Sequence, residues 1–416
     1  MDKRISVIGI GADGVQSLTQ EGKARIDAAQ ILYGGERQLA WFETFAGEKR
    51  RIQSPLGALV DDVLDMAKSH SIAILASGDP LFYGIGSTLS TRLGKGNVDV
   101  LPSVSSMQLA FARAGLAWQE AVLVSLHGKT MTGLAQKIHG MPLVGLLTDD
   151  THTPNAIANY LMRFQMTEYE VFVAENIGAV DERFGWYALE DMATHTFSNL
   201  NVVLLKRMPN VSVPSFALGM DDEVFTQRKP DRGLITKREI RVLSLAELAL
   251  RPGCVLWDIG ACTGSVSIEA LLMIPSLRVF AVEKNEGDLV NLRENQVKFR
   301  TDFVAIHQKA PDGLDEFPNP NAVFIGGSGG ELAAVIRISA SRLIPGGRIV
   351  VNAATIENLS EAKQTFAELG FTVQMTLVQT ARSKPILNLT RFEGMNPVYL
   401  VTAWKSLDKE VSAHAE

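Results

Sequence analysis

Short apolar runs alternate with amphipathic segments along the first part of the chain. The runs have the length and composition of buried strands, and we predict strands over residues 5–11, 29–34, 71–77 and 98–103. Between them apolar residues recur at helical spacing, for example over residues 56–64. Alternating strands and helices predict an α/β layer with a largely parallel sheet.

The pattern restarts near Ala114. Four further strands are predicted, over residues 121–128, 142–150, 169–178 and 201–207. We interpret them as a second α/β lobe. Residues 1–207 then form one domain with lobes of about 1–113 and 114–207.

The segment that follows has the composition of a linker. Residues 208–235 hold three prolines, a cluster of charges and little periodicity. We place the linker at residues 208–232 and expect a separable domain over 233–416.

The second domain also alternates helices and strands. A helix is predicted from about Thr236, because Thr236 and Glu239 have the spacing of a capping box. Strands are predicted over 254–261, 278–286, 303–311, 321–330 and 347–355, followed by a possible antiparallel pair from 370–381 and 397–404.

Bulk composition excludes several classes of protein. The 416 residues carry a formal net charge of −6, so the chain as a whole does not attract nucleic acid or anionic membranes. Two cysteines and no cluster of ligand residues argue against a disulfide framework and a metal site. No run approaches the roughly 20 apolar residues of a membrane span, and the N-terminus lacks a signal-peptide pattern. A cytoplasmic location is expected.

The segment WDIGACTGS, residues 257–265, has the pattern of a ligand site. Asp258 ends a strand, Gly260 and Gly264 bracket a turn, and a helix is predicted from Ser265. Glycine allows a close approach of ligand to backbone, and the helix would direct free N–H groups at it. The next strand ends in Glu283, a carboxylate suited to a ribose diol.

Two cofactors fit this pattern. A nicotinamide dinucleotide requires G-x-G-x-x-G for its pyrophosphate, whereas the loop here reads G-A-C-T-G. The preceding aspartate suits a positively charged amino-acid head group, which favours S-adenosylmethionine (SAM). A tight turn without a ligand is the structural alternative.

The second half resembles the decarboxylating corrin-ring methyltransferase domain of cobalamin biosynthesis. The resemblance runs through GLITKREIR, WDIGACTGSVSIEAL, VEKNE, QKAPDGL, FIGGSGGEL and PGGRIVVNA. It implies a Rossmann-like class I SAM-dependent methyltransferase fold. The residues implied to contact SAM are Thr236, Gly260, Ala261, Cys262, Thr263, Gly264, Glu283 and Ala310. Cys262 stands where the family usually has glycine.

The first half resembles the tetrapyrrole methylases, specifically their corrin C-5 methylase branch. The segments that carry this resemblance are ISVIGIGADGVQSLT, ASGDPLFYGIG, VSSMQLAFARAGL, LTDDTHTPNAIA and ENIGAVDERF. It implies the two-lobed class III methyltransferase fold and a second SAM site formed by Ala12, Gly78, Asp79, Phe82, Ser105 and Ser106. The resemblance implies that Gly9 and Gly11 line the tetrapyrrole trough. A tight turn between strand and helix is the alternative interpretation for both.

Together the two resemblances imply an enzyme that methylates one substrate twice. The implied substrate is precorrin-6B, methylated at C-5 by the first domain, and at C-15 by the second with decarboxylation of the C-12 acetate, giving precorrin-8. No catalytic base is identified. The acid–base candidates are His127 and His152, and the orienting candidates Glu175 and Asp181.

The many carboxylates of this substrate call for cations in its pocket. Candidates are Lys237 and Arg238 beside the predicted helix, with Arg232, and Arg382, Lys384 and Arg391 in a predicted loop. Solvated loop charges are the alternative interpretation for each. Related domains associate with themselves, which implies a homo-oligomer.

Three alternatives remain open at this point. The substrate could carry cobalt, as in the anaerobic route. A nucleic-acid methyltransferase would share the second-half fold but should display a basic surface, which the composition does not indicate. A non-catalytic tetrapyrrole-binding protein would tolerate decay of a glycine loop, and Cys262 is the one hint of that.

Overall fold

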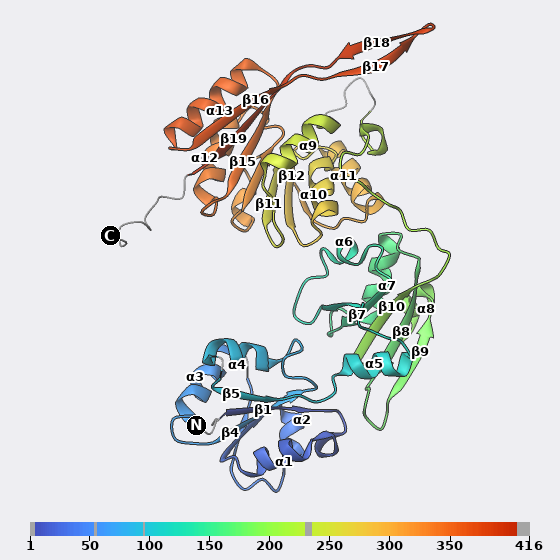
Figure 1. The fold of residues 1–416 in the computed structure, drawn as a ribbon, viewed down its shortest axis with the longest axis vertical. Coiled ribbons are helices and arrows are strands. Elements are labelled where there is room, and N and C mark those ends of the chain that lie inside the picture. Colours follow the sequence, from blue (N-terminus) through green and yellow to red (C-terminus); the bar gives the residue numbers. More distant parts are fainter. Residues whose placement is uncertain (1–4, 54–55, 95, 229–234, 406–416) are drawn as a thin grey trace. The chain divides into compact units, whose positions relative to one another are not determined.

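The computed structural model describes residues 5–53, 56–94, 96–228 and 235–405 (Figure 1). The chain divides into two compact units. The first holds residues 1–130, 140–162 and 167–211, and the second holds residues 131–139, 163–166 and 212–416. Arg232 lies outside the described residues.

The first unit begins with a parallel five-stranded sheet in the order β3-β2-β4-β1-β5. Its strands are β1 (Ile5–Ile10), β2 (Ile31–Gly34), β3 (Glu48–Arg51), β4 (Ile72–Ser77) and β5 (Val98–Leu101). Its helices are η1 (Gly14–Ser17), α1 (Gln20–Asp27), α2 (Glu36–Ala40), α3 (Leu56–Met66) and α4 (Ile85–Leu93). The next helix, α5 (Ser106–Ala114), packs instead against Phe172 and Leu204 of the second sheet. The four predicted strands are present. The edge strand β3, with the sequence EKRR, has no apolar run that could have signalled it.

The rest of the first unit is built on a mixed sheet in the order β6-β7-β10-β8-β9. Its strands are β6 (Val122–Ser125), β7 (Leu143–Leu147), β8 (Tyr169–Glu175), β9 (Arg183–Tyr187) and β10 (Asn201–Arg207). The helices that follow these strands in sequence are α6 (Leu134–Ile138), α7 (Pro154–Arg163) and α8 (Leu189–Thr194). β6 and β7 are parallel, whereas β10 and β9 pair antiparallel with their neighbours. The sequence predicted four of these strands and missed the edge strand β9.

The second unit contains a seven-stranded sheet in the order β13-β12-β11-β14-β15-β19-β16. Its strands are β11 (Val255–Ile259), β12 (Arg278–Glu283), β13 (Val304–His307), β14 (Ala322–Ile325), β15 (Arg348–Ala353), β16 (Thr372–Val378) and β19 (Val398–Trp404). Strands β11 to β15 are parallel, and β19 is antiparallel to both β15 and β16, as predicted for the end of the chain.

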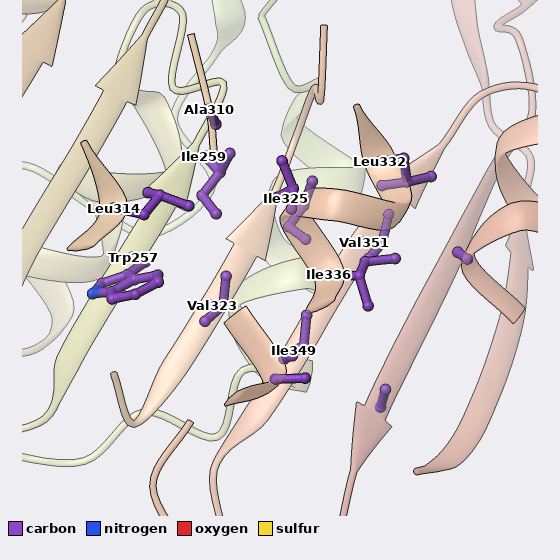
Figure 2. Close-up of a cluster of buried hydrophobic side chains, with 14 of the residues drawn as sticks. Trp257, Ile259, Ala310, Leu314, Val323, Ile325, Leu332, Ile336, Ile349 and Val351 are labelled. Atoms are coloured by element: carbon purple, nitrogen blue, oxygen red, sulfur yellow. The ribbon is translucent and has the colours of Figure 1, made fainter. Parts of the chain in front are cut away.

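Helices cover both faces of this sheet. They are η2 (Asp222–Val224), α9 (Arg238–Glu247), α10 (Ser265–Met273), α11 (Glu286–Lys298), η4 (Leu314–Glu316), α12 (Leu332–Arg342) and α13 (Ile356–Glu368). On one face Trp257 and Ile259 of β11 pack with apolar residues of α12 and α13 (Figure 2). On the other face Leu256 packs with residues of α9, α10 and α11. Alternate residues of β11 therefore enter two separate cores, which explains why its residues other than Asp258 are apolar. The predicted Rossmann-like class I fold is confirmed.

A two-stranded hairpin extends from the second unit between β16 and β19. It consists of β17 (Ala381–Ile386) and β18 (Leu389–Gly394), which pair with each other and form a separate sheet (Figure 1). The sequence prediction of a loop here is wrong. The segment forms a regular antiparallel ladder, in which Arg382 lies opposite Glu393 and Lys384 lies opposite Arg391.

Much of the predicted linker belongs to the second unit. The side chain of Glu269 accepts hydrogen bonds from the N–H groups of Gly219 and Met220, each at 3.0 Å. Phe225 is buried in the core beneath α9 and α10, and the N–H of Thr226 donates to Asn295. The predicted linker over 208–232 is therefore corrected: residues 219–226 are a fixed part of the second unit, because buried partners satisfy their backbone.

Candidate functional site

The loop between β11 and α10 passes very close to the loop that follows β14. Gly260 has φ +72°, and a Cβ at this position would lie 2.4 Å from the carbonyl oxygen of Gly327. Only a residue without a side chain fits between the two backbones. Gly264 has φ +73° and is the N-cap of α10, so the loop delivers the helix N-terminus to the carboxyl end of the sheet.

Cys262 adopts the left-handed conformation in the middle of this loop, with φ +49°. A side chain in this conformation costs roughly 1–2 kcal/mol, a cost that the glycine implied by the family resemblance would avoid. The residue is buried, and its N–H donates to Oε2 of Glu283 at 2.8 Å. Burial, with the nearby carboxylates of Asp288 and Glu283, raises the pKa of the thiol to about 12. The thiol is protonated at neutral pH, which makes it a poor nucleophile.

Glu283, at the end of β12, joins the loops after β11 and β12. Its Oε2 accepts from Cys262, and its Oε1 accepts from the N–H of Asn285 at 2.8 Å. A carboxylate offers about four acceptor sites, so both oxygens retain capacity for ligand hydroxyl groups.

Asp258 carries an unsatisfied carboxylate oxygen. The side chain is fully buried; Oδ2 accepts from the Ser267 hydroxyl at 2.5 Å, and Oδ1 has no hydrogen-bond partner among the described residues. Burial raises the pKa of Asp258 to about 6, and the negative charge of Glu283 adds to the effect. An orphaned anionic oxygen beside a glycine loop fits a cationic amino-acid group. The donor set therefore fits SAM rather than a dinucleotide.

The raised pKa of Asp258 predicts a pH-dependent stability. Between pH 3.8, the ordinary value, and about pH 6, the folded protein holds a proton that the unfolded chain has lost. The stabilisation is complete below that window and is lost as pH rises through about 6, which amounts to about 3 kcal/mol. In urea unfolding, we expect the stability of Asp258→Asn relative to the parent to increase as pH rises from about 4 to 6 and to stay constant above that. A difference that does not change with pH would contradict the assignment.

The remaining residues implied for this site lie around the same loop. Thr263 and Ala261 are buried within it, and the Thr263 carbonyl accepts from the Asn295 amide at 3.0 Å. Ala310 is buried in the core cluster that contains Ile259, and Figure 2 shows it beside the end of β11. Thr236 contributes its carbonyl oxygen to Nη1 of Arg241 at 2.6 Å.

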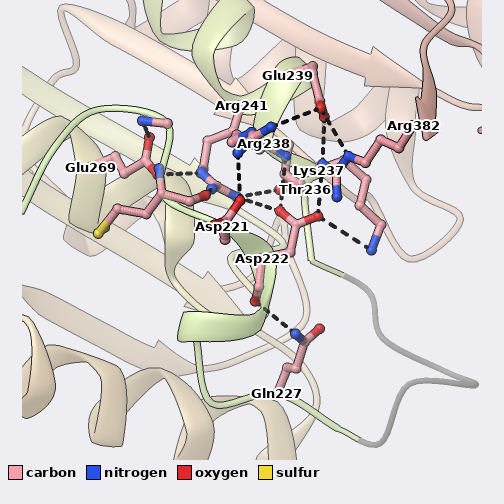
Figure 3. Close-up of polar contacts among 12 residues, drawn as sticks. Asp221, Asp222, Gln227, Thr236, Lys237, Arg238, Glu239, Arg241, Glu269 and Arg382 are labelled. Carbon is pink, nitrogen blue, oxygen red and sulfur yellow. Dashed lines mark hydrogen bonds and ion pairs between the residues drawn. The ribbon is translucent and has the colours of Figure 1, made fainter. Parts of the chain in front are cut away.

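A buried ion network fixes the start of α9 (Figure 3). Arg241 has no exposed surface and contacts Glu269 through Nε at 2.8 Å and Asp222 through Nη1 at 3.3 Å. The predicted capping box is wrong: α9 begins at Arg238, whose N–H donates to Asp222 Oδ1 at 2.9 Å, while Glu239 pairs with Arg382 at 2.7 Å. Asp222 thus satisfies the helix N-terminus in place of Thr236. The sequence patterns did not predict a site role for Arg241, Glu269 or Asp222.

Among the described residues, the five cations suggested for substrate binding in the second unit are each paired with a carboxylate. Lys237 and Arg238 pair with Asp222 at 3.8 Å and Asp221 at 2.5 Å. Arg382 joins Glu239 and Asp222, and it holds the pKa of Glu239 at about 2. Lys384 and Arg391 both pair with Glu393. Their charges are partly neutralised within the chain, so none of them is a bare anion site.

The residues implied for the other SAM site come together in the first unit. They line one cavity of about 950 Å³, at the upper end of the range for ligand sites. The lining includes Ala12, Gly78, Asp79, Phe82, Ser105 and Ser106. Ser105 caps α5, with its hydroxyl accepting from the Gln108 N–H at 3.2 Å, and Asp79 accepts from the Leu81 N–H at 2.9 Å. Gly11 lines the cavity, whereas Gly9 packs against Gly78, where a Cβ would meet the carbonyl oxygen at 2.1 Å.

The four acid–base and orienting candidates separate into two groups. His127 and Asp181 line the cavity, and Asp181 accepts from the Asn176 amide at 2.7 Å. Glu175 and His152 are not among the lining residues. Glu175 is buried and accepts from Ser198 N–H and from Arg183, and His152 contacts Asp149 at 2.9 Å. Both side chains are engaged by these partners outside the cavity lining, and a catalytic or orienting role for either stays a prediction.

Neither a metal cluster nor a membrane helix occurs in the part of the chain that the structure describes. No group of three or more His, Cys, Asp or Glu residues there could hold a metal ion. No described helix is long and apolar enough to cross a membrane.

Comparison with known proteins adds two family matches. A family described as "Tetrapyrrole (Corrin/Porphyrin) Methylases" matches residues 4–192, and one described as "Precorrin methyltransferase domain" matches residues 229–407. A Sinorhizobium protein named precorrin-6Y C(5,15)-methyltransferase [decarboxylating] is 33% identical over 96% of this chain and 95% of its own length.

Two shorter relatives come from Salmonella typhimurium. One is named cobalt-precorrin-7 C(5)-methyltransferase and is 31% identical over 49% of this chain and all of its own length. The other is named cobalt-precorrin-6B C(15)-methyltransferase (decarboxylating) and is 38% identical over 45% of this chain and 96% of its own length.

Proposed function

Because the chain belongs to the family of precorrin-6Y C(5,15)-methyltransferases (decarboxylating), we propose that it methylates precorrin-6B, also called precorrin-6Y, at C-5 and C-15. The C-12 acetate loses CO2, and the product is precorrin-8. The observation that carries the proposal is that the Sinorhizobium relative aligns over 96% of the chain, so both halves have counterparts in one protein of that name.

We propose that the two halves divide the work. The first domain would methylate C-5, and the second would methylate C-15 and decarboxylate. The two Salmonella relatives support this, since they are named for the C(5) and C(15) reactions and each aligns over about half of this chain.

The residues named above would hold one SAM in each half. When bound, SAM supplies an activated methyl group. In the second unit the 260–264 loop, Glu283 and Asp258 would bind and orient it, and in the first unit the cavity lining would do so. The meso carbon of a reduced tetrapyrrole is enamine-like and nucleophilic without a protein base, so positioning can supply much of the rate. The protonated Cys262 is consistent with a loop that binds rather than reacts.

Mass spectrometry of the full chain with substrate tests the proposal. With SAM and precorrin-6B we expect a product with two added methyl groups and one CO2 lost. The cobalt-containing substrate is the second candidate, favoured by the names of the Salmonella relatives, and it should be offered in parallel. An unchanged macrocycle with either substrate, while SAM still binds, would refute the substrate assignment and leave the fold intact.

The enzyme is further proposed to be a cytoplasmic homo-oligomer that assembles through the β17–β18 hairpin. Leu387, Leu389 and Phe392 of the hairpin are 97%, 74% and 74% exposed. A two-stranded hairpin is marginal in water, and apolar side chains on it call for a cover. Light scattering should show more than one chain per particle, and a monomer would contradict this assembly.

A further inference from the structure

Two cations of the first-unit cavity lack the carboxylate partners that the second-unit cations have. Arg37 and Lys129 both line the cavity and are exposed. Within the described residues neither side chain forms an ion pair or a hydrogen bond; each contacts an aromatic ring instead. Their positive charge is therefore available to a ligand, unlike that of Arg382 or Arg391.

Aromatic rings hold both cations at the cavity. The guanidinium of Arg37 lies 5.5 Å from the centre of the Trp41 ring, one helical turn along the chain. The ammonium of Lys129 lies 5.4 Å from the centre of the Tyr83 ring. The Tyr83 hydroxyl donates to the Leu123 carbonyl at 3.0 Å, which fixes that ring. A cation–π contact orients a cation without neutralising its charge.

The two carboxylates that line the cavity, Asp79 and Asp181, form no ion pair with these cations among the described residues. Asp79 accepts from the Leu81 N–H, and Asp181 accepts from the Asn176 amide. Trp41 and Tyr83 also line the cavity, so planar apolar surfaces lie beside the two cations. Aromatic faces next to bare cations match a flat macrocycle with carboxylates at its periphery.

We propose that Arg37 and Lys129 form a clamp that binds peripheral carboxylates of the tetrapyrrole in the first-unit cavity. The inference rests on the proposed function and adds specificity-determining residues to its C-5 methylation site. The rings of Trp41 and Tyr83 orient the two cations and provide surface for the macrocycle.

Kinetics of the full chain test the clamp. Arg37→Ala and Lys129→Ala should each raise the KM for C-5 methylation about ten-fold, the value expected for a lost hydrogen bond to a charged group, with kcat within about two-fold. Arg37→Lys and Lys129→Arg should recover most of the loss. C-15 methylation and decarboxylation, measured in the same product spectra, should keep their parent rates and so serve as an internal control for folding.

Arg163→Ala is the matched control variant. Its guanidinium lies 5.0 Å from the Phe164 ring, but Arg163 is not among the residues that line the cavity. This variant should leave KM unchanged. Added salt should weaken binding to the parent more than to an Arg37→Ala/Lys129→Ala double variant.

Binding of uroporphyrin, a stable octacarboxylate tetrapyrrole, separates the clamp from the proposed reaction. Both single variants should weaken its Kd about ten-fold. Unchanged KM and unchanged uroporphyrin Kd in both variants would overturn the clamp while the function stands. If the parent leaves the macrocycle unchanged, the proposed function fails, and uroporphyrin binding alone decides the clamp.

Discussion

Replacing Arg241 by alanine is expected to lower the free energy of unfolding of the second unit by about 4 kcal/mol. Arg241 and Glu269 both have fully buried side chains and meet at 2.8 Å. Removing the arginine leaves the Glu269 carboxylate without its countercharge in the protein interior. Asp222 also loses its contact with Arg241 (Figure 3). Because Asp222 accepts the Arg238 N–H, the N-terminus of α9 is then held less firmly.

Urea unfolding of the full chain, followed separately for its two units, measures this effect. Arg337→Ala is the matched control, since Arg337 pairs with Glu368 on the surface with side chains 51% and 44% exposed. It should cost less than about 1 kcal/mol. A double variant, Arg241→Met with Glu269→Leu, should recover part of the loss, because it removes both buried charges but leaves the N–H groups of Gly219 and Met220 without their acceptor. Equal losses in Arg241→Ala and Arg337→Ala would show that the network contributes little.

The sequence contained a signal for this network that periodicity analysis overlooks. Arg241 shares one helix face with Leu245 and Leu248, both buried, and Glu269 is the single charged residue of α10. A charge on an apolar stripe predicts a buried partner. The identity of the partner depends on how α9, α10 and the segment before α9 pack together. No local sequence pattern contains that information. The capping-box prediction failed for the same reason, since Asp222 comes from outside the helix.

Strand prediction succeeded where apolar runs are buried on both faces, as in β11 and β14. It failed at the edge strands β3 and β9, which are largely exposed and pair on one side only. The β17–β18 hairpin was predicted as a loop because its charged and polar residues lack alternation toward a core. Edge pairing is decided by the neighbouring strand, so single-sequence patterns carry little information about it.

The candidate sites divide in a similar way. Sites formed mainly by the backbone, such as the 260–264 loop and the residues after β4, could be predicted from the positions of glycines and strand ends. Side chains that line the cavity from separate segments, such as Arg37 and Lys129, carry no motif of their own. The Arg37–Trp41 pair has the i, i+4 spacing of a helix, whereas the Lys129–Tyr83 contact and the shared cavity appear only once the chain is folded.

Gly260→Ala is expected to abolish the contribution of the second unit to the proposed reaction, with a loss of more than about 100-fold in C-15 methylation. The added Cβ would lie 2.4 Å from the Gly327 carbonyl oxygen and 2.8 Å from its nitrogen, so the two loops must separate. Their separation displaces Cys262 and its hydrogen bond to Glu283. SAM binding should fall from two sites per chain to one, while C-5 methylation continues on any macrocycle that reaches the first unit.

Gly253→Ala isolates the steric part of this effect. Gly253 has φ +80°, and a Cβ added there would meet nothing within 4 Å, whereas Gly260 combines φ +72° with the backbone clash. Both variants carry the left-handed cost of roughly 1–2 kcal/mol, which unfolding experiments will register. Only Gly260→Ala should lose a SAM site, as counted by calorimetric titration. If both variants keep two sites, the close approach of the loops is not needed for binding; if both lose one, backbone strain rather than the clash disrupts the site.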